Sequence, residues 1–126
     1  MNSRSGAIWL VDDNEADNFL HKLVLERAGW EGEIRVFERP EHALEAALDE
    51  ALSLPAVVLL DVNMPRMSGW EWLARAAKAS PSMLQRVRVH VLTTSVDTVD
   101  VDRAKAVTGL AGVIQKPLSA ADVAAL

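Results

Sequence analysis

Short apolar runs recur along the chain and are separated by longer stretches with helical spacing. Apolar runs of about four to eight residues, bounded by polar ones, are typical of strands that are buried on both faces of a parallel sheet. The most apolar run, 56–60, is predicted to be a central strand, whereas 33–37 alternates only partly and is expected at an edge. The predicted strands are residues 7–11, 33–37, 56–60, 87–91 and 112–115.

Each predicted strand is followed by a pattern that predicts a helix. Asn14 is suited to cap the first helix and Gly29 to end it. Pro40 fits the first turn of the second helix, Pro81 ends the third, and Ser119 caps the last. The apolar residues at helical spacing are Ala16, Phe19, Leu20, Leu23, Val24 and Ala28; Ala43, Leu44, Ala47, Leu48, Ala51 and Leu52; Trp70, Leu73, Ala74 and Ala77; and Val101, Ala104, Ala106 and Val107.

Five strand–helix units in series predict an α/β fold, in which a parallel sheet carries helices on both faces and the crossovers are right-handed. The sequence contains no linker, internal repeat or low-complexity segment, so a single domain over residues 1–126 is expected, with a last helix that is short or truncated. Ligands of such folds bind beyond the carboxyl ends of the strands, near the point where the strand order reverses. A functional site is therefore expected at that edge.

Charged and hydroxyl side chains follow four of these strands at the same end. Asp12 and Asp13 follow the first strand, Asp61 the third, Thr93 the fourth and Lys116 the fifth. Two carboxylates about 4 Å apart repel by about 4 kcal/mol at an effective dielectric constant near 20, so three of them require a compensating positive charge. Lys116 offers one charge and a divalent cation offers two. Oxygen ligands without cysteine or paired histidine favour Mg²⁺ or a similar hard ion.

Taken alone, each of these residues has a simple structural explanation. Asp12 and Asn14 suit helix capping, aspartates are common in turns after strands, and a lone Lys116 is typical of a solvated surface. Their joint occurrence at matching strand ends favours phosphoryl chemistry. A carboxylate can attack phosphorus in line while a metal ion and a lysine neutralise the phosphate oxygens.

Composition narrows the class of site further. The chain has 126 residues, a formal net charge of −5 and no cysteine, which excludes disulfides, thiol catalysis and cysteine-ligated metal sites. It has no Lys/Arg-rich run to bind a nucleic-acid backbone, so no nucleic-acid partner is expected. No apolar run approaches the roughly 20 residues of a membrane helix, and the N-terminal segment does not resemble a signal peptide. We expect a cytoplasmic protein without membrane contact.

Four segments resemble, in order, the motifs of the receiver domain of two-component response regulators. They are Val11-Asp12-Asp13-Asn14; Leu60-Asp61-Val62-Asn63-Met64-Pro65 with Ser68-Gly69-Trp70-Glu71; Leu92-Thr93-Thr94-Ser95; and Gln115-Lys116-Pro117-Leu118. The resemblance covers nearly the whole chain. It implies a doubly wound, flavodoxin-like fold with strand order 2-1-3-4-5, a cis Lys116–Pro117 bond, and a stand-alone signalling module that is not an enzyme.

The resemblance also implies the phosphoacceptor and the metal ligands. Asp61 is expected to accept a phosphoryl group from a histidine kinase or a histidine phosphotransfer protein, as a member of a phosphorelay. Asp13, Asp61 and the backbone carbonyl of Asn63 are expected to bind Mg²⁺, with Asp12 acting mainly through water. Output is expected through contact with a downstream protein whose identity the sequence does not reveal, and the sequence does not determine the oligomeric state.

Further roles follow from the same resemblance. Thr93, in preference to the adjacent Thr94, is expected to be the hydroxyl that moves toward the phosphoryl group. Lys116 is expected to be the ion-pair partner of that group. Asn63 and Ser95 match positions that tune the lifetime of the phosphorylated state.

The chain departs from the family pattern at one conspicuous place. Val113 stands on the fifth strand where family members usually carry Tyr or Phe, and the sequence contains no Tyr. The coupling from Thr93 to the output surface therefore cannot use the rotation of an aromatic ring. Among the other large side chains, Trp70 is predicted to be core. Trp72 lies off the apolar side of its helix, where packing is favoured over partial exposure at a partner surface. Three histidines are interpreted as packing or helix-face residues: His21, His42 and His90.

Two other functions remain open from the sequence. One is an interaction module that keeps this fold without being phosphorylated, which the Val113 departure favours. The other is a Mg²⁺-dependent phosphatase that uses a phosphoaspartate, but such enzymes need a second aspartate two residues after the nucleophile, and Asn63 occupies that position. A flavin-binding domain is weaker still, since no hydroxyl-rich loop follows the first strand.

Overall fold

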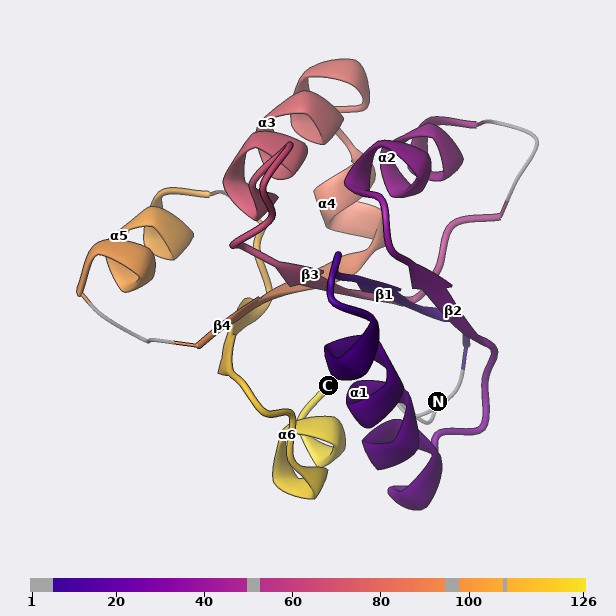
Figure 1. Ribbon diagram of the computed structural model, residues 1–126. Helices are drawn as coiled ribbons and strands as arrows, with labels where there is room; N and C mark the ends of the chain where they lie inside the picture. The colour runs from indigo at the N-terminus through magenta and orange to yellow at the C-terminus, as the bar shows by residue number, and fades with distance from the viewer. Residues whose placement is uncertain (1–5, 50–52, 95–97, 108) are drawn as a thin grey trace.

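The computed structural model of the protein describes residues 6–49, 53–94, 98–107 and 109–126. Its centre is a parallel sheet in the order β2-β1-β3-β4-β5, which confirms the predicted fold class and strand order (Figure 1). The strands are β1 (Ile8–Val11), β2 (Ile34–Phe37), β3 (Val57–Asp61), β4 (Arg88–Thr93) and β5 (Gly112–Gln115). The 33–37 run forms an edge strand and the 56–60 run the central one, as predicted.

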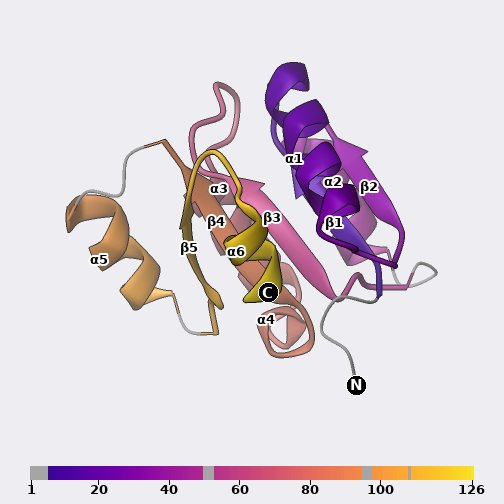
Figure 2. The same ribbon diagram turned by 90° about the horizontal axis from the view of Figure 1, so that it is seen from below.

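Helices cover both faces of this sheet. They are α1 (Glu15–Arg27), α2 (Pro40–Leu48), α3 (Gly69–Ala79), α4 (Met83–Arg86), α5 (Thr98–Ala106) and α6 (Ala120–Ala124). On one face lie α2, α3 and α4, and on the other α1 and α6 lie side by side, while α5 lies at the β5 edge (Figures 1 and 2). The short α4 was not predicted, and α2 ends before Ala51 and Leu52, which fall outside the described residues.

Capping side chains begin three of the helices, at the predicted Asn14 and Ser119 and at Ser68, which was not predicted as a cap. Asn14 Oδ1 accepts a hydrogen bond from the backbone N–H of Asp17 at 3.0 Å, and Ser68 Oγ accepts one from Glu71 at 3.1 Å. Ser119 and Asp122 form a reciprocal capping box at α6, which stabilises a helix of only five residues.

The inward side of α1 differs from the predicted apolar side. Phe19 and Leu20 are 71% and 42% exposed, whereas Asn18, His21 and Leu25 are buried. The reason is local: Asn18 Nδ2 donates a hydrogen bond of 2.8 Å to the backbone carbonyl of Asp12, which turns the polar side of the helix toward the end of β1. Two large apolar side chains are consequently left on the surface.

The orientation of α3 buries Trp72 more deeply than Trp70, which was predicted to be core. Trp72 is fully buried and its Nε1–H donates to the carbonyl of Pro40 at 3.0 Å, whereas Trp70 is only partly buried. A Cβ on Gly69 would lie 2.6 Å from the carbonyl oxygen of Asp61, so this glycine lets the helix begin directly against the β3 end. Trp72 and Leu73, which follow Gly69 by three and four residues, therefore lie on the same side of the helix and face the sheet.

Two further features bear on the predictions. The Lys116–Pro117 peptide bond is cis, as the family resemblance implied. Among the described residues, no helix is both long enough and apolar enough to cross a membrane.

Candidate functional site

Three carboxylates converge at the carboxyl ends of β1 and β3. The two strands are neighbours in parallel register, with Val11 opposite Leu60, so the residues that follow them lie at the same level. Asp12, Asp13 and Asp61 each offer a carboxylate oxygen within 4.8 Å of the others. Asp12 and Asp61 are buried, with 2% and 4% of their surfaces exposed, while Asp13 opens to solvent. The structure thus brings together the acids that the sequence placed at strand ends.

Lys116 enters this cluster from the end of β5. Its Nζ lies 2.7 Å from Asp12 Oδ2 and 3.4 Å from Asp61 Oδ1. A third carboxylate also contacts it, since Asp17 Oδ2 on α1 lies 2.8 Å away. Lys116 is itself tied to β4, because its backbone N–H donates to the carbonyl of Thr93 at 2.8 Å.

The electrostatics leave Asp61 poorly compensated. Burial and the neighbouring charge of Asp12 raise its pKa from 3.8 to about 6, against the opposing effects of Lys116 and of the backbone N–H of Asn63. That N–H donates to Asp61 Oδ1 at 3.2 Å. Burial alone would lower the pKa of Lys116, but its hydrogen bonds to Asp12 and Asp17 raise that pKa above the usual range for lysine. The lysine is therefore a permanent cation, and Asp61 is the acid whose charge is least satisfied.

The remaining predicted site residues occupy different surroundings. Thr93 is buried at the end of β4, beside β3, whereas Thr94 is exposed, so only Thr93 lies within the protein at this edge. Asn63 is exposed, and its backbone N–H supports Asp61 as described above. Ser95 lies outside the described residues.

Asp17 is the residue at this site that the sequence analysis missed. It lies in the first turn of α1, where acids are common because they interact favourably with the helix dipole. Spacing alone therefore gives no reason to assign it to the site.

On the same helix, the pKa of His21 is lowered, mainly by burial and to a smaller extent by the charge of Lys116. This keeps the buried imidazole neutral at pH 7.

The acid cluster fits a hard divalent cation. All of its ligand atoms are carboxylate oxygens, and a single ammonium group does not neutralise three closely placed acids, as the raised pKa of Asp61 indicates. Asp12, Asp13 and Asp61 are the residues that would hold such an ion. An acidic cluster of this kind is typical of the magnesium site of receiver domains.

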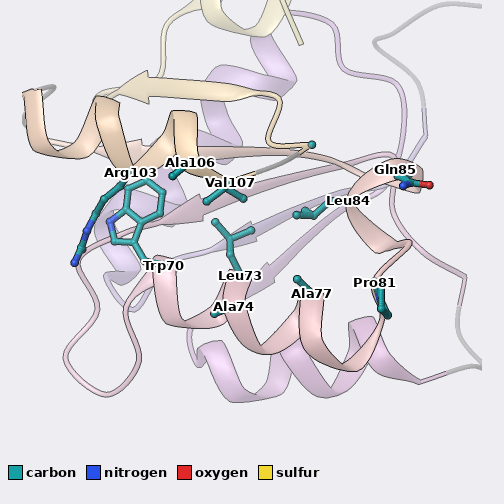
Figure 3. Close-up of a pocket in the computed structure, with 11 residues that line it drawn as sticks. Trp70, Leu73, Ala74, Ala77, Pro81, Leu84, Gln85, Arg103, Ala106 and Val107 are labelled. Carbon is teal, nitrogen blue, oxygen red and sulfur yellow. The ribbon is translucent and has the colours of Figure 1, made fainter.

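A second concave region lies away from the acids, between α3, α4 and α5. It is an apolar groove of about 560 Å³. Trp70 and Arg103 face each other at one end, with the guanidinium carbon 6.0 Å from the ring centroid (Figure 3). Leu73 and Val107 face each other across its floor, and none of the site acids lines it.

Comparison with known proteins agrees with this geometry. The response regulator receiver domain family matches residues 8–126. The "probable methanogenesis regulatory protein FilR2" of Methanothrix harundinacea is 35% identical over 119 residues, which cover 92% of this chain and 75% of that protein.

Solved structures extend the similarity to three dimensions. A two-component response regulator from Cytophaga hutchinsonii has a TM-score of 0.84 at 25% identity, covering 93% of this chain and 90% of its own. The Mn(2+)-bound form of Rcp1, a response regulator of Synechocystis sp., has a TM-score of 0.76 at 27% identity, covering 95% and 87%. Together with the family match over residues 8–126, these similarities establish that the chain belongs to the response regulator receiver domain family.

Proposed function

We propose that the protein is the phosphoacceptor of a two-component phosphorelay, with Asp61 as the residue that receives the phosphoryl group. The single observation that carries this proposal is the position of Asp61: buried, beside two other acids, and 3.4 Å from the ammonium of Lys116. Its raised pKa of about 6 still leaves it mostly ionised at pH 7, as a carboxylate nucleophile requires.

The phosphodonor in this proposal is a phosphohistidine of a histidine kinase or histidine phosphotransfer protein. A carboxylate oxygen of Asp61 attacks the phosphorus, an O–P bond forms and the N–P bond breaks. The imidazole nitrogen leaves with the electron pair and takes up a proton. Mg²⁺ held by Asp12, Asp13, Asp61 and the carbonyl of Asn63 would neutralise charge on the phosphoryl oxygens.

Lys116 and Thr93 supply the chain's own contacts to the phosphoryl group in this account. The ammonium of Lys116 adds a positive charge next to Asp61, where phosphorylation converts a carboxylate of charge −1 into an acyl phosphate that carries about −1.5 to −2. Thr93 offers a hydroxyl at the end of the adjacent strand. Because the backbone N–H of Lys116 is bonded to Thr93, a shift of either residue is transmitted to the other. Val113, half-buried on β5, would transmit the change by repacking of an aliphatic side chain.

The surface beside the site suits a protein phosphodonor. Phe19 is 71% exposed and Leu20 42% exposed on α1, within three residues of Asp17. Exposed large apolar side chains close together are typical of protein-contact surfaces. We assign these two residues to the contact with the phosphodonor.

Incubation with acetyl phosphate and Mg²⁺ tests the proposal. The wild type should gain one phosphate by intact mass, and hydroxylamine should release it. Asp61→Asn should gain none, whereas Glu26→Gln, which changes an exposed acid on the outer part of α1, should behave as wild type. A wild type that gains no phosphate under these conditions would contradict the proposal.

Two further measurements, turnover of a phosphomonoester and binding of a partner, separate the alternatives. Receiver domains are in general signalling modules rather than enzymes, and a phosphatase would instead turn over a phosphomonoester many times. A receiver-like module that is never phosphorylated, which Val113 favours, would bind its partner equally well as wild type and as Asp61→Asn.

A further inference from the structure

We propose that Asp17 is a positioning residue of the phosphoacceptor site. In this view Asp17 and Asp12 together hold the Lys116 ammonium so that its remaining N–H is directed at Asp61. The inference rests on the proposed phosphorylation of Asp61. It adds a residue on α1 to a site otherwise built from strand ends.

The geometry of the ammonium group carries the inference. A lysine ammonium has three N–H donors and no acceptor. Two of them are used at 2.7 Å and 2.8 Å, by Asp12 and Asp17, which are the lengths of strong charge-assisted hydrogen bonds. The third carboxylate, Asp61, lies at 3.4 Å, an ion-pair distance without a hydrogen bond. One donor of Lys116 is thus left on the side of Asp61 for an oxygen added there.

Asp17 is itself held in place. Its backbone N–H donates to the side chain of Asn14 at 3.0 Å, which fixes the first turn of α1. The next residue, Asn18, donates to the carbonyl of Asp12 at 2.8 Å and anchors the helix to the end of β1. The carboxylate of Asp17 is therefore held on a rigid helix turn. Its contact with the ammonium restrains the flexible four-carbon side chain of Lys116.

Burial makes this contact more than a surface ion pair. The side chain of Lys116 is 9% exposed and that of Asp17 36% exposed, so the pair is shielded from water on the lysine side. Without Asp17, Lys116 would keep one strong hydrogen bond, to Asp12, and could rotate about it. We therefore expect Asp17→Ala to slow phosphorylation by acetyl phosphate at saturating Mg²⁺ by roughly three- to tenfold, the range for losing one partly exposed charged hydrogen bond.

A double-mutant cycle with Lys116→Met provides the decisive test. If Asp17 acts through Lys116, Asp17→Ala slows phosphorylation in the wild-type background but changes it by less than about twofold when Lys116 is already Met. Glu15→Ala is the matched control, because it removes the same charge from the same first turn of α1 at an exposed position, and it should leave the rate unchanged. An equal slowing in both backgrounds, no effect, or faster phosphorylation of Asp17→Ala would each overturn the inference.

Thermal midpoints of the same proteins in EDTA keep this inference separate from the proposed function. They require no phosphorylation and also report whether each variant folds. Asp17→Ala and Lys116→Met should each lower the thermal midpoint. The shift of the double variant should be smaller than the sum of the two, because the same Asp17–Lys116 ion pair is lost in all three proteins. Additive shifts would contradict the Asp17–Lys116 coupling, whereas an unphosphorylated wild type with non-additive shifts would contradict only the function of Asp61.

Discussion

Replacing Asp61 with Asn should stabilise the metal-free protein, because it removes a poorly compensated buried charge while nearly preserving the shape of the side chain. The pKa of Asp61 is raised from 3.8 to about 6. At about 1.4 kcal/mol per pH unit, this difference corresponds to about 3 kcal/mol of unfolding free energy. This value is an upper limit for the gain, because part of the repulsion is shared with Asp12.

The stability advantage of Asp61→Asn should increase with pH. An acid whose pKa is raised on folding binds its proton more tightly in the folded state, so its contribution to stability is present at low pH and is lost as pH rises from about 3.8 to about 6. The advantage of Asp61→Asn over wild type should therefore be at most about 1 kcal/mol at pH 4.5 and at most about 3 kcal/mol at pH 8. Comparing two proteins at each pH cancels the titrating groups that do not interact with Asp61.

Urea unfolding followed by tryptophan fluorescence, in EDTA, measures this difference directly. Glu26→Gln, at an exposed position, should show no gain at either pH. Saturating Mg²⁺ should reduce the advantage of Asp61→Asn, because a cation that binds only the folded wild type stabilises it. An Asn variant that is no more stable than wild type at pH 8, or whose advantage does not shrink on acidification, would refute the account of the electrostatics.

Other predictions concern the elements that position and surround the site. Gly69→Ala should destabilise the protein by about 2–4 kcal/mol in urea unfolding and slow acetyl-phosphate labelling of Asp61, because the added Cβ would lie 2.6 Å from a backbone oxygen; an effect below about 1 kcal/mol would contradict this. Trp72→Phe should cost about 2–3 kcal/mol and Trp70→Phe less than about 1 kcal/mol, since only the former is fully buried and loses a hydrogen bond; equal costs would argue against the orientation of α3. Phe19→Ser should slow transfer from a phosphohistidine protein that labels the wild type by roughly tenfold while leaving labelling by acetyl phosphate unchanged, and equal slowing with both donors would remove this residue from the donor contact.

The sheet and the acid cluster were predictable because both follow from backbone topology. Once the strands are parallel, the residues after them share one edge, so Asp12 and Asp61, which follow the neighbouring strands β1 and β3, lie near one another. Lys116 follows β5, two strands beyond β3, and its long side chain brings the ammonium to these acids. Apolar runs identify buried strands irrespective of side-chain detail, and β3 is indeed buried at every position.

The rotations of the helices were not predictable, because they depend on single close contacts between distant residues. The inward side of α1 is set by the hydrogen bond from Asn18 to the carbonyl of Asp12, which outweighs the apolar spacing of Phe19. Similarly, the approach of Gly69 to the β3 end decides that Trp72 is buried. Asp17 was missed for the same reason, since only the orientation of α1 brings it to the lysine.

The identity of the labelled residue is the most direct test of the central claim. The protein is treated with acetyl phosphate and Mg²⁺, the acyl phosphate is reduced with borohydride, and the peptides are sequenced by mass spectrometry. The account predicts that the aspartate at position 61 is recovered as homoserine. Reduction at Asp12 or Asp13 instead, or unmodified peptides throughout, would contradict it.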